Sequence, residues 1–297
     1  MDEQKIEFRK MREFGENLND TFVFIRQNFK SLLGPFFAIC GVFMLAQAVF
    51  NGMYQSTVFS GIFDQLFNGR PSYSAGTQPF EHVFNGTYFL MILFTVLTFV
   101  AMPVTLGAYI KFYVENDGAQ PTLEQVWALF KKYFFKMFLY SIPLYLLVVI
   151  GFVFCIAPGV WLAVTLAPFT LVVMIEDQNF SGAFYRCIDI VKDNFWISFG
   201  IYLVAGIIYK FSSGIVSVVV GLIAGVLTYF STRSVGTTAG IVTSFLNIFS
   251  FVFYIIFFVS LALHYFNLVE RRDGTGILNR IDTIGSTDDK PAAGEEY

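Results

Sequence analysis

The sequence predicts an all-α integral membrane protein with six transmembrane helices in three hairpins, each hairpin preceded by a cytoplasmic interfacial amphipathic helix. The composition is 56% hydrophobic and 14% charged, whereas soluble domains average about 25% charged residues. Residues 137–175 contain no Asp, Glu, Lys, Arg or His. A bilayer core of about 30 Å takes roughly 20 helical residues, so this one stretch is long enough for two spans.

The spans can be placed along the chain by the same criterion. Residues 1–30 carry six basic side chains before any apolar run, which predicts a cytoplasmic interfacial helix rather than a cleaved leader. Residues 31–270 then form the membrane domain, with spans predicted at about 32–54, 87–112, 137–156, 158–175, 196–226 and 241–268. The turn between the third and fourth spans is predicted at Ala157-Pro158-Gly159, since proline interrupts a helix.

The fifth span has two possible forms. The apolar stretch 195–232 is too long for one upright helix. It is either one tilted helix that projects beyond the bilayer, or a span that breaks at Ser212-Ser213-Gly214 and continues as a re-entrant segment. A seventh full span would place the C-terminal arginines outside, against the charge rule.

The basic residues predict the orientation. With both termini in the cytoplasm, the cytoplasmic segments hold sixteen of the nineteen Lys and Arg residues. Only Arg70 and Arg233 fall in outer loops, and Lys210 lies inside a span. The positive-inside rule therefore favours a multi-pass protein with cytoplasmic N and C termini.

A short phrase of basic and aromatic residues recurs before three spans, at 25–29, 130–134 and 191–195. The second and third copies align with an offset of about 61 residues, which predicts an internal repeat of interfacial helix, rising span and falling span. Ordinary flanking of spans by basic and aromatic anchors is the alternative. The predicted anchors, which would face anionic lipid of the inner leaflet, are Arg26, Asn28, Phe29, Lys131, Lys132, Phe134, Lys192, Asn194, Phe195 and Trp196.

Three carboxylates, Glu115, Glu176 and Glu270, close the descending spans at matching places. Simple capping and solubility explain them. The alternative is that they pair with Arg26, Lys131 and Lys192 and clamp each interfacial helix to its hairpin. Exposed pairs of this kind are worth only about 0–1 kcal/mol.

The basic-aromatic phrase gives the chain a family resemblance. An aromatic interfacial helix that ends in Arg/Lys-x-Asn-Phe and leads into Gly/Pro-interrupted hairpins occurs in residues 21–36 and 183–201, with a closing segment at 269–285. This pattern resembles uncharacterised bacterial polytopic proteins of the glycerophosphodiester-phosphodiesterase membrane-domain superfamily. The resemblance implies residence in a bacterial inner membrane and no assigned activity. We do not transfer the enzymatic label, because two histidines cannot supply a metal-dependent phosphodiesterase site.

Lys210 is a charge inside a predicted span, where an ionised lysine costs about 2.5–3.5 kcal/mol. It either reaches the outer headgroups along its flexible side chain, or has an internal role in a groove, paired with a carboxylate or a lipid phosphate. Farther along, Ser213, Ser217, Gly221 and Gly225 recur every four residues. Such a stripe of small residues favours close helix packing, within the chain or with a partner.

Residues 271–297 have the composition of a mobile cytoplasmic tail. Within it, segment 276–285 has the spacing of a short amphipathic helix, which predicts docking on a membrane or a partner. Its apolar residues are Ile277, Leu278, Ile281 and Ile284.

The sequence does not predict chemistry. No common catalytic signature is present, the three cysteines and two histidines lie far apart, and no basic run is long enough for nucleic acid. We therefore expect no cofactor or metal, and a non-enzymatic scaffold or accessory subunit of a membrane assembly. A small transporter or lipid-handling protein with a groove near Lys210 is the alternative, and a membrane-embedded enzyme has the least support.

Overall fold

The computed structural model describes residues 5–67, 86–232 and 242–274, and within these ranges the chain is helical with no strand. Six helical segments are long and apolar enough to cross a membrane, which confirms the predicted six-helix, all-α membrane class. The elements are α1 (Phe14–Phe67), α3 (Gly86–Glu115), α4 (Leu123–Phe154), α5 (Ile156–Leu166), α6 (Phe169–Ile175), α7 (Phe180–Val191), η1 (Lys192–Asn194), α8 (Phe195–Thr232), η2 (Asn247–Phe253) and α10 (Tyr254–Asp273).

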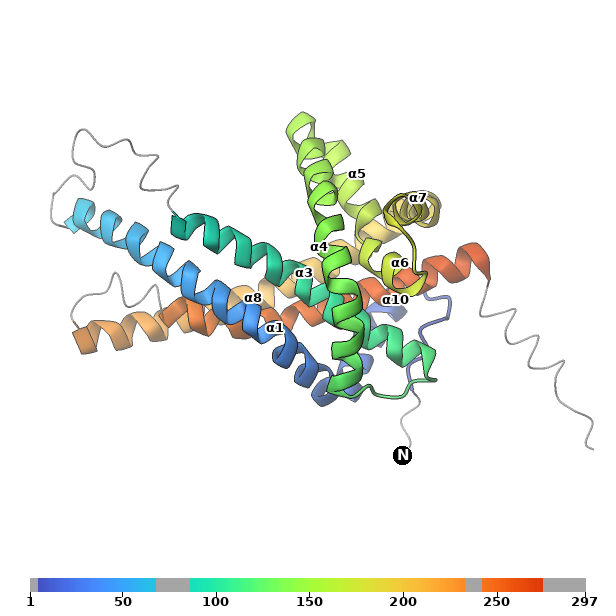
Figure 1. Ribbon diagram of the computed structural model, residues 1–297, viewed down its shortest axis with the longest axis horizontal. Coiled ribbons are helices and arrows are strands. Elements are labelled where there is room, and N and C mark those ends of the chain that lie inside the picture. The colour runs from blue at the N-terminus through green and yellow to red at the C-terminus, as the bar shows by residue number, and fades with distance from the viewer. Residues whose placement is uncertain (1–4, 68–85, 233–241, 275–297) are drawn as a thin grey trace, which may run out of the picture.

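The helices form two associated pairs and one arm. α1 packs against α3, and α8 packs against α10, with α1 and α10 also in contact. The α4–α5 hairpin points in a different direction from both pairs (Figure 1). It is attached at its base, where α4 contacts α3 and α5 contacts α7 and the start of α8.

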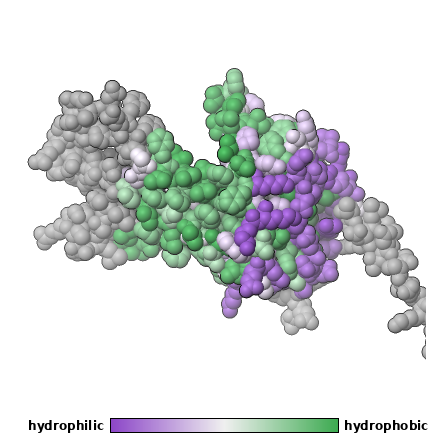
Figure 2. Space-filling view, viewed as in Figure 1, coloured by the Kyte–Doolittle hydropathy of each residue, from purple (hydrophilic) through white to green (hydrophobic). Residues whose placement is uncertain are grey.

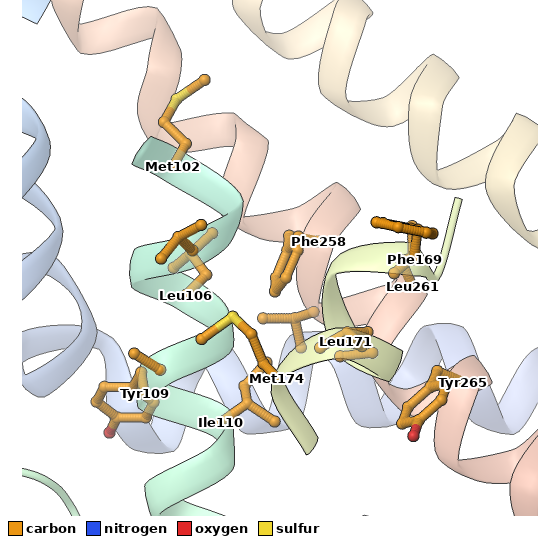
Figure 3. Packing of buried hydrophobic residues seen from close by; sticks show 14 of the residues in the cluster. Met102, Leu106, Tyr109, Ile110, Phe169, Leu171, Met174, Phe258, Leu261 and Tyr265 are labelled. Atoms are coloured by element: carbon orange, nitrogen blue, oxygen red, sulfur yellow. The ribbon is translucent and has the colours of Figure 1, made fainter. Parts of the chain in front are cut away.

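The core lies where α3, α6 and α10 meet. Figure 3 shows Leu106 and Ile110 of α3 beside Met174 of α6 and Phe258 of α10; all four side chains are at most 3% exposed. Gly107 allows this approach, because a Cβ there would lie 2.9 Å from the sulfur of Met174. The interior of the bundle at this level is therefore filled with apolar side chains.

Polar residues collect at one end of the molecule, which we call the charged end. It comprises the N-terminal segment 5–13, the loop 116–122, the turn 176–179, α7 and the last turn of α10. Figure 2 shows this hydrophilic region beside the hydrophobic surface of the membrane helices. The separation matches the division expected between lipid and water.

The hairpin turn differs from its predicted place by a few residues. The break occurs at Cys155, which is extended (φ −168°, ψ 149°), and Pro158 lies in the first turn of α5. Proline is tolerated there because the first N–H groups of a helix have no helical partner. The predicted span 158–175 corresponds to the candidate membrane segment Ile156–Ile175. That segment is made of two helices, since α5 ends at Leu166 and α6 begins at Phe169 after Pro168.

Of the three predicted interfacial helices, one is a separate helix in the described part of the chain. α1 and α4 run without a break from the predicted interfacial segments into their spans, so no helix ends at residue 30. Only α7 is a separate amphipathic helix, joined to α8 by the 3₁₀ turn η1. In that turn Asp193 and Asn194, both weak helix formers, stand side by side.

The proposed repeat consequently has unlike local structures. Its first two copies lie inside continuous helices, whereas the third forms η1. The second and third copies, which the 61-residue offset relates, therefore differ in local structure.

The alternatives for α8 are resolved in favour of one helix. It continues from Phe195 to Thr232 through Ser212-Ser213-Gly214 without a break. The predicted sixth span begins with the 3₁₀ segment η2 before α10.

We expect Gly159→Ala to destabilise the α4–α5 hairpin by about 1–3 kcal/mol through overpacking. A Cβ on Gly159 would lie 2.5 Å from the ring of Phe152 and 2.8 Å from its backbone nitrogen. Thermal unfolding of the detergent-purified protein measures the effect. Gly41→Ala is the control, because a Cβ on Gly41 meets nothing within 4 Å. Equal melting of the two variants would contradict the close packing.

Candidate functional site

Arg12 holds the N-terminal segment onto the charged end. Its guanidinium is buried and donates to Asp20 at 2.8 Å and to the carbonyl oxygens of Phe8, Lys10 and Glu7. Its backbone N–H and C=O pair with the side chain of Asn267, each at 3.0 Å. Residues near the start of the chain are thereby fixed to α10.

Lys111 joins three segments of the charged end. Its side chain is 8% exposed, and its Nζ donates to the carbonyl oxygen of Met174 at 2.7 Å. The carboxylates of Glu115 and Asp177 lie 3.2 and 3.6 Å from the same Nζ. A buried ammonium is costly when unpaired, so these partners fix the ends of α3 and α6 together.

Asp177 extends this network to α4. Tyr133 donates to its carboxylate, and Lys132 lies 3.6 Å away. The hydrogen bond from Tyr133, followed by the charges of Lys111 and Lys132, holds the pKa of this carboxyl below its usual value. The residue has φ +49°, a conformation in which Asp is more frequent than most side chains.

A second network fixes α7. Arg186 contacts Glu176 at 3.1 Å and also donates to Asp273 at the end of α10. Glu176 in turn accepts from the hydroxyl of Tyr265 at 2.9 Å.

Arg272 adds a link on the outer side of α7. It contacts Asp189 at 2.9 Å and Asp193 at 3.3 Å, and Lys192 also pairs with Asp189 at 2.8 Å. Ion pairs thus hold α7 to the end of α10 and, through Arg186 and Glu176, to the turn 176–179 that precedes α7.

These contacts correct the predicted clamps. Glu115 and Glu176 pair with Lys111 and Arg186, not with Lys131 or Lys192. Glu270 is buried, at 5% exposure, rather than a solvated cap. Glu176 therefore does form an ion pair with the interfacial helix α7, but its partner is Arg186 and not one of the residues that were predicted.

The predicted anchors have mixed environments. Asn28 is buried and bonds to Phe24, Tyr109 and Gln120, so it packs helices together instead of facing lipid. Phe134 is also buried, and Asn194 uses its carbonyl to accept from Ser198. The anchors that are exposed are Arg26, Phe29, Lys131, Lys132, Lys192 and Trp196, while Phe195 is half-buried.

Lys210 lies at the edge of a surface groove between α8 and α10. The groove has a volume of about 380 Å³ and is almost wholly apolar, with Tyr202, Gly206, Ile207, Tyr254 and Phe257 in its lining. The Lys210 ammonium is exposed and lies 5.0 Å from the ring centre of Tyr209. Among the described residues no carboxylate forms an ion pair with it.

The small-residue stripe is used partly within the chain. Ser217 contacts Ser250 of η2 at 3.2 Å, and Ser213 donates to the carbonyl of Lys210. Gly221 has nothing within 4 Å of a Cβ position. Gly225 lies where side-chain surroundings are not described, and Ile277, Leu278, Ile281 and Ile284 lie outside the described residues.

A second apolar cleft lies where the α4–α5 hairpin meets α8. It has a volume of about 570 Å³ and is lined by Pro158, Trp161, Trp196 and Phe199, among others. We call it the Trp cleft. Trp161 and Trp196 are 41% and 78% exposed, so both rings are available to a partner or to lipid.

Sequence reasoning missed the buried polar side chains. Lys111 and Arg12 entered the sequence analysis only through the count of cytoplasmic basic residues. His264 bonds Ser198 at 2.8 Å in the core, which no motif indicated. The spacing of Lys111 and Glu115, four residues apart, was the one local signal. No group of potential metal ligands occurs among the described residues.

No family model, curated protein or solved structure matches the chain.

We expect Asp177→Asn to lower the melting temperature at pH 7 and to flatten its decline in acid. Because the folded pKa is lowered, the carboxylate stabilises the fold above its ordinary pKa of about 4, and this contribution is lost as the pH falls below that value. Melting curves between pH 7 and pH 3 measure both effects.

Asp117→Asn is the matched control. Asp117 has nearly the same backbone conformation, φ +48°, but its carboxylate makes no ion pair with any described residue. An acid profile of Asp177→Asn identical to that of the wild type would contradict the assigned role.

Proposed function

We propose that the protein is a non-enzymatic component of a bacterial inner membrane, acting as a scaffold or accessory subunit that binds other membrane segments. The charged end and both termini would lie in the cytoplasm, as the distribution of basic residues favours. The observation that carries the proposal is the α4–α5 hairpin, which diverges from the helix pairs (Figure 1). The Trp cleft lies at its junction with α8.

Burial supports lateral binding in this region. In their most apolar stretches α4 and α8 are 17% and 6% buried, against 39–56% in the other four candidate spans. Exposed apolar helix faces are normal toward lipid. A cleft that also presents two tryptophans has the aromatic composition enriched at binding hot spots.

The interior supports binding rather than transport. The core between α3, α6 and α10 is filled, and the groove at Lys210 is apolar and open at the surface. Neither feature offers a polar route along the bundle.

The scaffold role is tested by isolating the tagged protein in native detergent at its native expression level. The wild type should retain a reproducible set of membrane proteins near stoichiometry. The double variant Trp161→Ala/Trp196→Ala should lose them by tenfold or more, as expected for hot-spot aromatics worth about 2 kcal/mol or more together.

Phe89→Ala/Phe211→Ala is the matched control, since these exposed rings lie outside the cleft. A third variant lacking residues 275–297 tests the tail. A wild-type chain that repeatedly purifies alone would refute the scaffold role, and partners kept by the tryptophan variant would refute the cleft as their site.

The orientation is tested with Cys155, which is exposed at the hairpin tip, whereas Cys40 and Cys187 are buried. If all six segments cross and the charged end is cytoplasmic, a membrane-impermeant maleimide should label Cys155 in spheroplasts. The label should disappear in Cys155→Ser. Labelling that appears only after permeabilisation would contradict the proposed topology.

A further inference from the structure

The groove at Lys210 combines an apolar channel with a single charge at one end. Along α8 the lining runs from Tyr202 to Lys210, and Tyr254 and Phe257 of α10 form the opposite wall. Lys210 lies about 21 Å along the helix from Trp196, so the groove rises from the middle of the apolar helix toward the end remote from the charged end.

Gly206 makes the groove deep enough for a ligand. It lies on the groove-facing part of α8, and the nearest atom to its Cβ position is a ring carbon of Phe257 at 4.0 Å. A side chain could be added here without a clash with the backbone. Such a side chain would occupy the space that a ligand needs.

The charge restricts what can fill the groove. No carboxylate of the described residues pairs with Lys210, and within that part of the chain the ring of Tyr209 is the contact recorded for its ammonium. An apolar helix from a partner or a second copy would cover this ammonium without neutralising it, which is unfavourable in lipid. A ligand with an anionic head and a flexible apolar chain complements both parts of the site.

We propose that this groove is a binding site for one anionic phospholipid, whose phosphate contacts Lys210 and whose acyl chain lies along the groove over Gly206 toward Tyr202. The ring of Tyr209 stabilises the ammonium by a cation–π contact. The site holds its lipid in a fixed place, in contrast to the exchanging lipids that surround any membrane helix. The inference does not depend on the proposed scaffold role.

The test uses phosphatidylglycerol with a photoactivatable diazirine in its acyl chain, reconstituted with the full-length protein. Cross-linked peptides are quantified by mass spectrometry, and the phosphatidylcholine probe with the same chain is the zwitterionic comparison. Phosphatidylglycerol should label the groove segments around Gly206 and Phe257 more strongly than phosphatidylcholine does.

Three variants distinguish the effect of the Lys210 charge from the effect of the groove's shape. Lys210→Gln should reduce labelling by phosphatidylglycerol about fivefold, the effect of one basic residue near an anionic lipid, and Lys210→Arg should restore it. Gly206→Leu should reduce labelling of the groove by both probes, because it fills the channel.

Gly214→Leu is the matched control, since Gly214 is on the same helix, exposed, and has nothing near its Cβ position; it should label as the wild type does. Equal labelling by the two lipids, or unchanged labelling in Gly206→Leu, would overturn the proposal. So would a disulfide between two copies that carry Gly206→Cys, because it would show that a second chain covers the groove.

Discussion

The arrangement of the helices depends on one buried cation. The Nζ of Lys111 is held by the carbonyl of Met174 and the carboxylates of Glu115 and Asp177. In a membrane protein the lipid supplies no hydrophobic force between helices, so polar contacts at the helix ends have more influence on which helices associate. Through Tyr133, the same carboxylate of Asp177 also fixes the base of α4.

This network determines where the hairpin begins but not where it points. α4 is held to α1, α3 and the turn 176–179 at its base, and beyond Met137 many of its apolar side chains are exposed. The α4–α5 arm is therefore fixed at its base, and much of the α4 surface toward the tip is exposed. The Trp cleft lies at the junction of this arm with α8, where residues of α5 and of the first turns of α8 line one apolar surface.

The membrane class and the six apolar segments could be predicted from the sequence, because hydrophobic length is a local property. Local sequence patterns gave wrong predictions where the structure depends on contacts between residues far apart in the chain. Amphipathic spacing before the first and second predicted hairpins did not end the helices, and Pro158 did not mark the turn, because a proline fits the first turn of α5. The partners of Glu176 could not be read from spacing either, since Tyr265 lies 89 residues away. Asn28 shows the same limit, because its burial against Tyr109 is not visible in the basic-aromatic phrase that contains it.

The unbroken length of α8 also affects how the protein fits into a bilayer. Its 38 residues extend about 57 Å, nearly twice the thickness of the hydrocarbon layer. A rod of this length must lean or leave its far end in water, and the balance between the two changes with the thickness of the bilayer. α8 packs along α10, whose end is tied by Arg272 to Asp189. We therefore expect a change in the lean of α8 with lipid thickness to affect these contacts at the charged end.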